Sequence, residues 1–102
     1  RLGGADSRRG HLLRQAIAAG PADDVIETGI AIVGGGIAGL SAGWALHDAG
    51  RRDFRLLELE DAPGGNARAG RNAISAHPLG AHYLPVPNPE SRGIIRLLEQ
   101  LR

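Results

Sequence analysis

The feature that most constrains the fold is a set of glycines with the spacing Gly-x-Gly-x-x-Gly at Gly34, Gly36 and Gly39. An apolar, β-branched run at residues 28–33 (TGIAIV) comes directly before them, and residues 37–48 follow with helical spacing of apolar side chains. Glycine lowers the stability of regular structure, so glycines gathered here indicate a backbone conformation or a close approach that side chains prevent. The pattern predicts a strand, a tight turn and a helix.

A second apolar run, residues 54–59 (FRLLEL), predicts another strand, and Gly50 supplies a stop signal for the helix before it. Gly43 lies one helical turn after Gly39, where a close contact between helix and sheet calls for a small residue. We therefore expect an α/β fold, a Rossmann-like βαβ unit with parallel strands and a right-handed crossover.

This βαβ pattern suits the binding of a dinucleotide. Gly34 allows the sharp turn out of the strand, Gly36 lets a pyrophosphate approach the backbone, and Gly39 lets the helix pack close to the strand. The first turn of the helix, which includes Ile37 and Ala38, offers unpaired N–H groups and a partial positive charge to the phosphates.

An acidic residue near the end of the second strand completes the pattern. Glu58 is placed to accept hydrogen bonds from ribose hydroxyls, and Leu59 is assigned to the same site. A carboxylate there disfavours a 2′-phosphate and therefore NADP. Glu60 is the alternative, because it shares a strand face with Glu58. We prefer Glu58, which lies inside the apolar run, and expect Glu60 at the surface beyond the end of the strand.

A Gly-Gly pair, Gly64-Gly65, follows Glu58 within the segment LLELEDAPGGNAR. With these residues the chain resembles the FAD-binding domain of the glutathione-reductase-like flavoproteins, in the branch of flavin-containing amine oxidases and phytoene desaturases. The resemblance covers roughly residues 24–101 and implies FAD as the cofactor. It implies that the Gly-Gly backbone passes close to FAD, in addition to the pyrophosphate contacts of the first glycines and the ribose contact of Glu58.

The residues after the Gly-Gly pair depart from the amine oxidase pattern. Amine oxidases of this branch usually have Arg directly after the pair, whereas this chain has Asn66, with Arg68 two positions further on. The form GGNAR looks more like the desaturase-like relatives and argues against a monoamine substrate. The resemblance implies that Arg68 pairs with the FAD phosphates, with a solvated loop arginine as the alternative.

The segment HPLGAHYLPVPNPES resembles the part of these families that runs beside the isoalloxazine ring. On that basis Gly80, Ala81 and His82 are expected near the flavin, together with Tyr83 as a packing residue whose hydroxyl is satisfied. His82 is expected to line the pocket or to bond to the backbone; a proton-shuttle role is the alternative. The catalytic residues stay unassigned.

The rest of the chain carries weaker signals. Residues 1–24 read as an N-terminal extension with a short helix at 12–19, and residues 25–102 as the N-terminal part of an FAD-binding domain. The Gly- and Pro-rich stretch after Gly65 reads as loop, with short extended pieces at 73–76 and 82–84. Apolar spacing predicts a helix at 90–101.

Composition excludes several classes of function. The net charge is +1, with 12 basic and 11 acidic residues in no cluster, so no nucleic-acid partner is expected. Cysteine is absent and the four histidines lack ligand spacing, so no metal site is expected. No apolar run approaches the ~20 residues of a membrane helix. The compartment stays open, with the cytoplasm as the default and export or peripheral membrane association as alternatives; the oligomeric state is likewise open.

The chain starts with Arg1 and stops within an apolar-periodic segment, so we expect a piece of a longer protein. The favoured interpretation is the N-terminal part of an FAD-dependent oxidoreductase that acts on a small-molecule substrate and passes electrons to a separate acceptor. The isolated piece is expected to be unstable, inactive and a weak FAD binder. One alternative is an NAD-binding dehydrogenase domain, which predicts a parallel sheet continuing soon after Glu58. The other is a non-catalytic nucleotide-binding module or a degenerate flavoprotein fragment.

Overall fold

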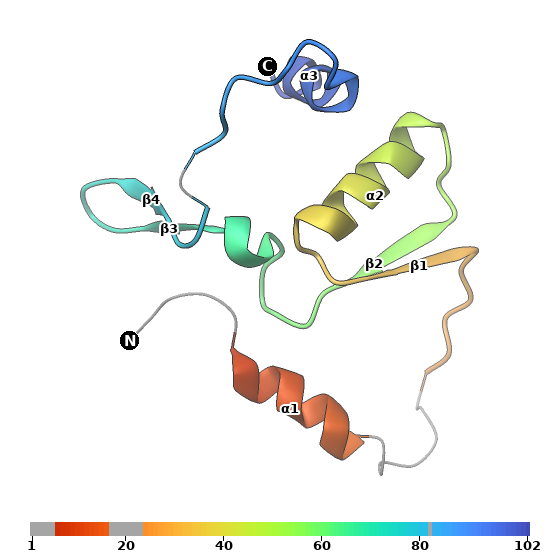
Figure 1. Cartoon of the computed structure of the whole chain (residues 1–102). Helices are drawn as coiled ribbons and strands as arrows, with labels where there is room; N and C mark the ends of the chain where they lie inside the picture. The colour runs from red at the N-terminus through yellow and green to blue at the C-terminus, as the bar shows by residue number, and fades with distance from the viewer. Residues whose placement is uncertain (1–5, 17–23, 82) are drawn as a thin grey trace.

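A computed structural model describes residues 6–16, 24–81 and 83–102. Figure 1 shows one βαβ unit with a small hairpin on one side of it and a helix near each end of the chain. The elements in chain order are α1 (Ser7–Ala16), β1 (Ile30–Val33), α2 (Ile37–Asp48), β2 (Phe54–Leu57), the 3-10 turn η1 (Gly65–Ala67), β3 (Ala69–Arg71), β4 (Ala76–Pro78) and α3 (Arg92–Gln100).

The βαβ unit is parallel, which confirms the predicted fold class. β1 and β2 pair in register from Ile30 opposite Phe54 to Val33 opposite Leu57. α2 lies along one face of this pair (Figure 1). Its only fully buried residue among those described is Gly43, and a Cβ built there would lie in ordinary contact with β1 and β2 side chains, 3.5 Å from Phe54. The space between helix and sheet at position 43 therefore accommodates a small side chain.

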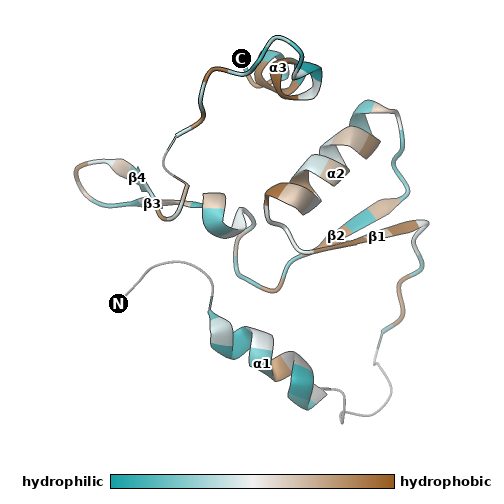
Figure 2. Cartoon of the chain, in the orientation of Figure 1, coloured by the Kyte–Doolittle hydropathy of each residue, from teal (hydrophilic) through white to brown (hydrophobic). Residues whose placement is uncertain are grey.

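Among the described residues, the side chains on the other face of the β1–β2 pair are exposed. Val33 is 84% exposed there, and no apolar side chain in the described part of the chain is fully buried. The accessible surface of the chain is 8794 Å², against about 5,500 Å² expected for a compact monomer of this mass. Figure 2 shows apolar residues concentrated on β1 and on α2. The βαβ unit therefore lacks an enclosed core of its own, and the instability of the isolated chain stays a prediction.

Each of the two predicted strands extends two residues beyond the observed strand at one of its ends. β1 begins at Ile30 rather than at residue 28, because its partner β2 begins only at Phe54. β2 ends at Leu57 because the next residue, Glu58, turns its carboxylate back to the glycine turn. The helix predicted at 37–48 has the observed bounds of α2.

The N-terminal helix begins five residues earlier than predicted. The carboxylate of Asp6 accepts a hydrogen bond from the backbone N–H of Arg8 at 3.0 Å, as an N-cap residue does, and α1 starts at Ser7. The predicted end at residues 17–19 lies outside the described residues. α3, by contrast, begins two residues later than predicted, at Arg92 rather than at residue 90. Asn88 closes a turn before it by accepting the N–H of Glu90 at 2.9 Å.

The extended pieces expected at 73–76 and 82–84 are wrong. The observed strands are β3 and β4, which pair antiparallel with Gly70 opposite His77. Most of the first expected piece is the hairpin turn instead, where the Asn72 side chain accepts the N–H groups of Ile74 and Ser75 at 2.9 Å each. Residues 83–84 form no strand, and residue 82 lies outside the described part.

Candidate dinucleotide-binding site

The glycine turn between β1 and α2 needs glycine at two of its three predicted positions for reasons of fold. Gly34 has a φ of +99°, which L side chains rarely adopt. A Cβ on Gly39 would collide with the carbonyl oxygen of Gly34 and lie 3.3 Å from Ile32. A Cβ on Gly36, by contrast, would meet no atom within 4 Å. The fold therefore does not require glycine at position 36, whereas a ligand that approaches the backbone there would require it.

The N-terminus of α2 faces the open side of this turn without a side-chain cap. Gly36 occupies the N-cap position and makes no side-chain hydrogen bond, while its carbonyl accepts the N–H of Leu40 at 2.9 Å. The N–H groups of Ile37, Ala38 and Gly39 belong to the first turn, which has no intrahelical acceptors for them. The partial positive charge of the helix end favours an anionic ligand.

Glu58 is fixed to the glycine turn by its carboxylate. Its Oε2 accepts the backbone N–H of Gly35 at 2.6 Å, and its Oε1 accepts the N–H of Glu60 at 2.8 Å. Gly35 is buried, and a Cβ there would lie 2.7 Å from the same Oε2. A carboxylate has about four lone-pair positions, so both oxygens can accept further hydrogen bonds from a ligand.

The pKa of the Glu58 carboxyl lies below its ordinary value of 4.5. The main cause is that the N–H of Glu60, and then that of Gly35, donates to the charged form; partial burial opposes this, and the charge of Arg68 adds to the lowering. Because folding lowers this pKa, Glu58 stabilises the folded state in full above pH 4.5, and that contribution is lost as the pH falls through the folded-state pKa.

Glu58→Gln is therefore expected to lower the free energy of unfolding most at neutral pH. The difference between the parent and this variant should shrink in acid, because protonation removes the same charge from the parent. Urea unfolding of both proteins from about pH 7 to about pH 3 measures it. A difference that grows in acid would contradict the assigned hydrogen bonds.

The Gly64-Gly65 pair folds back onto the first glycine turn. The N–H of Gly64 donates to the carbonyl of Gly35 at 2.7 Å, and a Cβ on Gly65 would lie 3.2 Å from the Cα of Gly36. Both residues have positive φ, +119° and +52°. The two glycine motifs, separated in sequence by a helix and a strand, thus form one continuous surface of bare backbone.

The remaining predicted residues follow this pair. The carbonyl of Asn66 accepts the N–H of Ala81 at 3.1 Å, and a Cβ on Gly80 would lie 2.6 Å from the same oxygen. The carbonyl of Arg68 accepts the N–H of Leu79 at 3.2 Å. The structure therefore brings the two glycine motifs and the segment at residues 79–81 to one place. His82 lies outside the described residues, so its predicted role stays a prediction.

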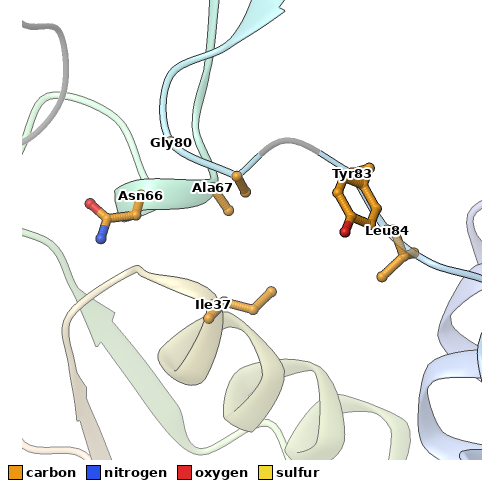
Figure 3. Close-up of a pocket in the computed structure, with 7 residues that line it drawn as sticks. Ile37, Asn66, Ala67, Gly80, Tyr83 and Leu84 are labelled. Atoms are coloured by element: carbon orange, nitrogen blue, oxygen red, sulfur yellow. The ribbon is translucent and has the colours of Figure 1, made fainter.

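A pocket of about 640 Å³ opens above the N-terminus of α2. In Figure 3, Ile37 points up into it from α2, Asn66 and Ala67 border it from η1, and Tyr83 and Leu84 border it from the loop after the hairpin. Among the described residues, its lining consists of Ile37, Asn66, Ala67, Gly80, Ala81, Tyr83 and Leu84. Most of these side chains are apolar, so the pocket suits a largely apolar group next to the phosphate-facing turn.

A family model for the NAD(P)-binding Rossmann-like domain matches residues 32–101. The chain belongs to this family. The family is described as NAD(P)-binding. A dinucleotide ligand agrees with the geometry of the two glycine motifs and Glu58.

One solved structure is similar to this Rossmann-like domain, the CLA-producing fatty acid isomerase from P. acnes. The two are 29% identical with a TM-score of 0.58, over 76% of this chain and 18% of the isomerase. The Rossmann-like domain thus spans less than a fifth of the length of that protein. A search of curated proteins finds no match.

Several residues of the Rossmann-like domain's site were missed from the sequence. Gly35 supplies the N–H that fixes Glu58, and three consecutive glycines were the available signal. Ala67 and Leu84 line the pocket without a periodic signal in their loops. The packing role expected for Tyr83 is wrong, because the residue is 84% exposed at the pocket rim.

The expectation for Glu60 is also wrong in part. It lies beyond the end of β2, as expected, but its side chain is only 18% exposed, because Oε1 accepts the N–H of Asp6 at 2.7 Å. Leu59, assigned to the cofactor site, offers its carbonyl to Arg9 at 3.1 Å instead. Whether Leu59 also touches a ligand stays a prediction.

Two further findings bear on the class of site. Among residues 6–16, 24–81 and 83–102, no three His, Asp or Glu side chains are grouped so that they could hold a metal ion. No helix within those same ranges has the length and apolar character needed to cross a membrane.

Proposed function

We propose that the Rossmann-like domain binds FAD and serves an FAD-dependent oxidoreductase of the amine oxidase and desaturase-like branch. The observation that carries this proposal is the Gly64-Gly65 turn, whose backbone packs on Gly35 and Gly36 through the 2.7 Å hydrogen bond. The alternative, an NAD-binding dehydrogenase domain, predicts a third parallel strand soon after Glu58. In the described part of the chain, β2 is followed instead by η1 and an antiparallel hairpin, which favours FAD.

The site residues fit a dinucleotide in a defined orientation. The open space at Gly36 and the free first turn of α2 at Ile37 and Ala38 suit the pyrophosphate. The fixed carboxylate of Glu58 suits the adenosine ribose, and the charge of Arg68 suits the phosphates. Gly80 and Ala81, in the pocket wall, suit the flavin end. When bound, FAD would accept a hydride from the substrate and pass the electrons to an acceptor.

The visible spectrum of the intact protein tests this proposal. Flavin absorbance that co-purifies and survives gel filtration is the expected result. A colourless protein that binds NAD would favour the dehydrogenase alternative. A protein that binds neither cofactor would favour a non-catalytic nucleotide-binding module.

The isomerisation of a polyunsaturated fatty acid is a second candidate activity for the intact protein. It is favoured by the similarity to the CLA-producing fatty acid isomerase and by the apolar lining of the pocket at Ile37, Ala67 and Leu84. Such a reaction removes a hydrogen from one carbon and returns one to another, with no net oxidation. Incubation with a fatty acid that has separated double bonds, followed by ultraviolet absorbance of conjugated double bonds, tests it. Absence of that absorbance in a flavin-loaded protein would argue against it.

A further inference from the structure

The N-terminal helix is joined to the segment that directly follows the candidate ribose-binding residue. Nη1 of Arg9 donates to the carbonyl of Leu59 at 3.1 Å, and its Nη2 donates to Asp61 at 2.7 Å. One residue before α1, the backbone N–H of Asp6 donates to Glu60 at 2.7 Å. Three consecutive residues after Glu58 are thus each bonded to the start of α1. We call these contacts the clasp.

The clasp is connected to the glycine turn through a series of hydrogen bonds. Asp6 donates to the carboxylate of Glu60, and the N–H of Glu60 donates to Oε1 of Glu58. Oε2 of Glu58 in turn accepts the N–H of Gly35. The backbone position of Glu60 therefore depends on α1 at one side and orients the Glu58 carboxylate at the other.

The parts of the clasp differ in strength. Asp61 is 84% exposed, so its ion pair with Arg9 contributes little by itself. The side chain of Glu60 is 18% exposed and that of Arg9 is 32% exposed, so the bonds to Glu60 and to the Leu59 carbonyl are better shielded from water. Leu12 on α1 is largely exposed. Polar contacts of Asp6 and Arg9, rather than this apolar side chain, therefore attach α1 here.

We propose that α1 serves the dinucleotide site, with Arg9 as a positioning residue that holds the segment after β2 so that Glu58 meets the adenosine ribose. Arg9 bonds to neither Glu58 nor, in this proposal, the ligand; it acts through the Leu59 carbonyl and through its ion pair with Glu60 at 3.9 Å. The proposal rests on the proposed function, in which a dinucleotide places its ribose at Glu58. The N-terminal extension then supports the binding site from outside it and is more than a linker.

The test measures binding of ADP to the intact protein after removal of its bound cofactor. ADP carries the adenosine ribose and diphosphate without flavin or nicotinamide. Arg9→Ala is expected to raise the Kd for ADP about 5- to 10-fold, the loss of one or two hydrogen bonds. Arg8→Ala is the matched control, because among the described residues the Arg8 side chain bonds only to the Asp6 carboxylate, whereas the clasp uses the backbone N–H of Asp6. This variant should change the Kd less than about twofold. Arg9→Lys should recover part of the affinity.

A double-mutant cycle separates positioning from a general loss of structure. In a Glu58→Ala background, Arg9→Ala should change the Kd for ADP less than about twofold, because the residue it positions is gone. An equal effect of Arg9→Ala in both backgrounds, or none relative to Arg8→Ala, would overturn the role of the clasp and leave the proposed function standing. A parent protein that binds neither ADP nor FAD would overturn both.

Discussion

Gly36→Val is expected to reduce dinucleotide affinity on the order of 100-fold while the protein stays folded. The backbone of Gly36 has a φ of −73°, which valine adopts readily, and a Cβ there meets no protein atom within 4 Å. The added side chain therefore costs the fold little and takes up the space of the ligand. Titration of the variant with FAD or ADP, together with its unfolding curve, measures both effects.

Gly93→Ala in α3 is the control for this variant. A Cβ at Gly93 also meets no atom within 4 Å, but the residue lies away from both glycine motifs. It should bind the dinucleotide as the parent does. Undiminished binding by Gly36→Val would show that the open space at Gly36 has no ligand in it.

Gly39→Ala is expected to destabilise the βαβ unit itself, by about 3 kcal/mol. Its Cβ would overlap the carbonyl oxygen of Gly34 and lie 3.0 Å from the carbon of the same group. These are backbone atoms of a turn already fixed at positive φ, so they cannot move aside cheaply. Denaturant unfolding of the intact protein, with and without bound cofactor, measures the loss.

Gly43→Ala is the control for this second change, because it lies one turn further along α2. Its Cβ would make ordinary contacts at 3.5–4.0 Å with Phe54, Ile32 and Leu56. Alanine is also a better helix former than glycine by about 1 kcal/mol, so this variant should be as stable as the parent or more so. Equal stability losses in Gly39→Ala and Gly43→Ala would contradict the steric assignment of Gly39.

The βαβ unit and its glycine turn could be predicted because their signals are local. The strand, turn and helix each occupy a short run of sequence, and Gly34, Gly36, Gly39 and Glu58 fall at fixed points within those runs. The bounds of α2 followed from apolar spacing together with the stop signal of Gly50. The start of β1 and the end of β2 did not follow from the sequence, because they depend on pairing with the other strand and on the turn of Glu58 toward Gly35.

The parts that escaped prediction depend on contacts between distant segments. Nothing near Arg9 in the sequence indicates Leu59 or Asp61 as its partners. For the same reason Glu60 was expected at the surface, although Asp6 shields its carboxylate. Tyr83 was expected to be a packing residue from the resemblance, yet its side chain is 84% exposed at the rim of the pocket. The sequence of an irregular segment has no periodic pattern from which the spatial neighbours of its residues could be predicted.

The central claim is that backbone from two glycine motifs receives the diphosphate while Glu58 receives the adenosine ribose. A crystal structure of the intact protein with bound FAD tests it most directly. We expect the diphosphate at the N–H groups of Gly36 and Ile37, beside Gly65, and the ribose hydroxyls within hydrogen-bond distance of the Glu58 carboxylate. Density for the adenosine end anywhere else, or a protein side chain occupying the space at Gly36, would contradict this arrangement.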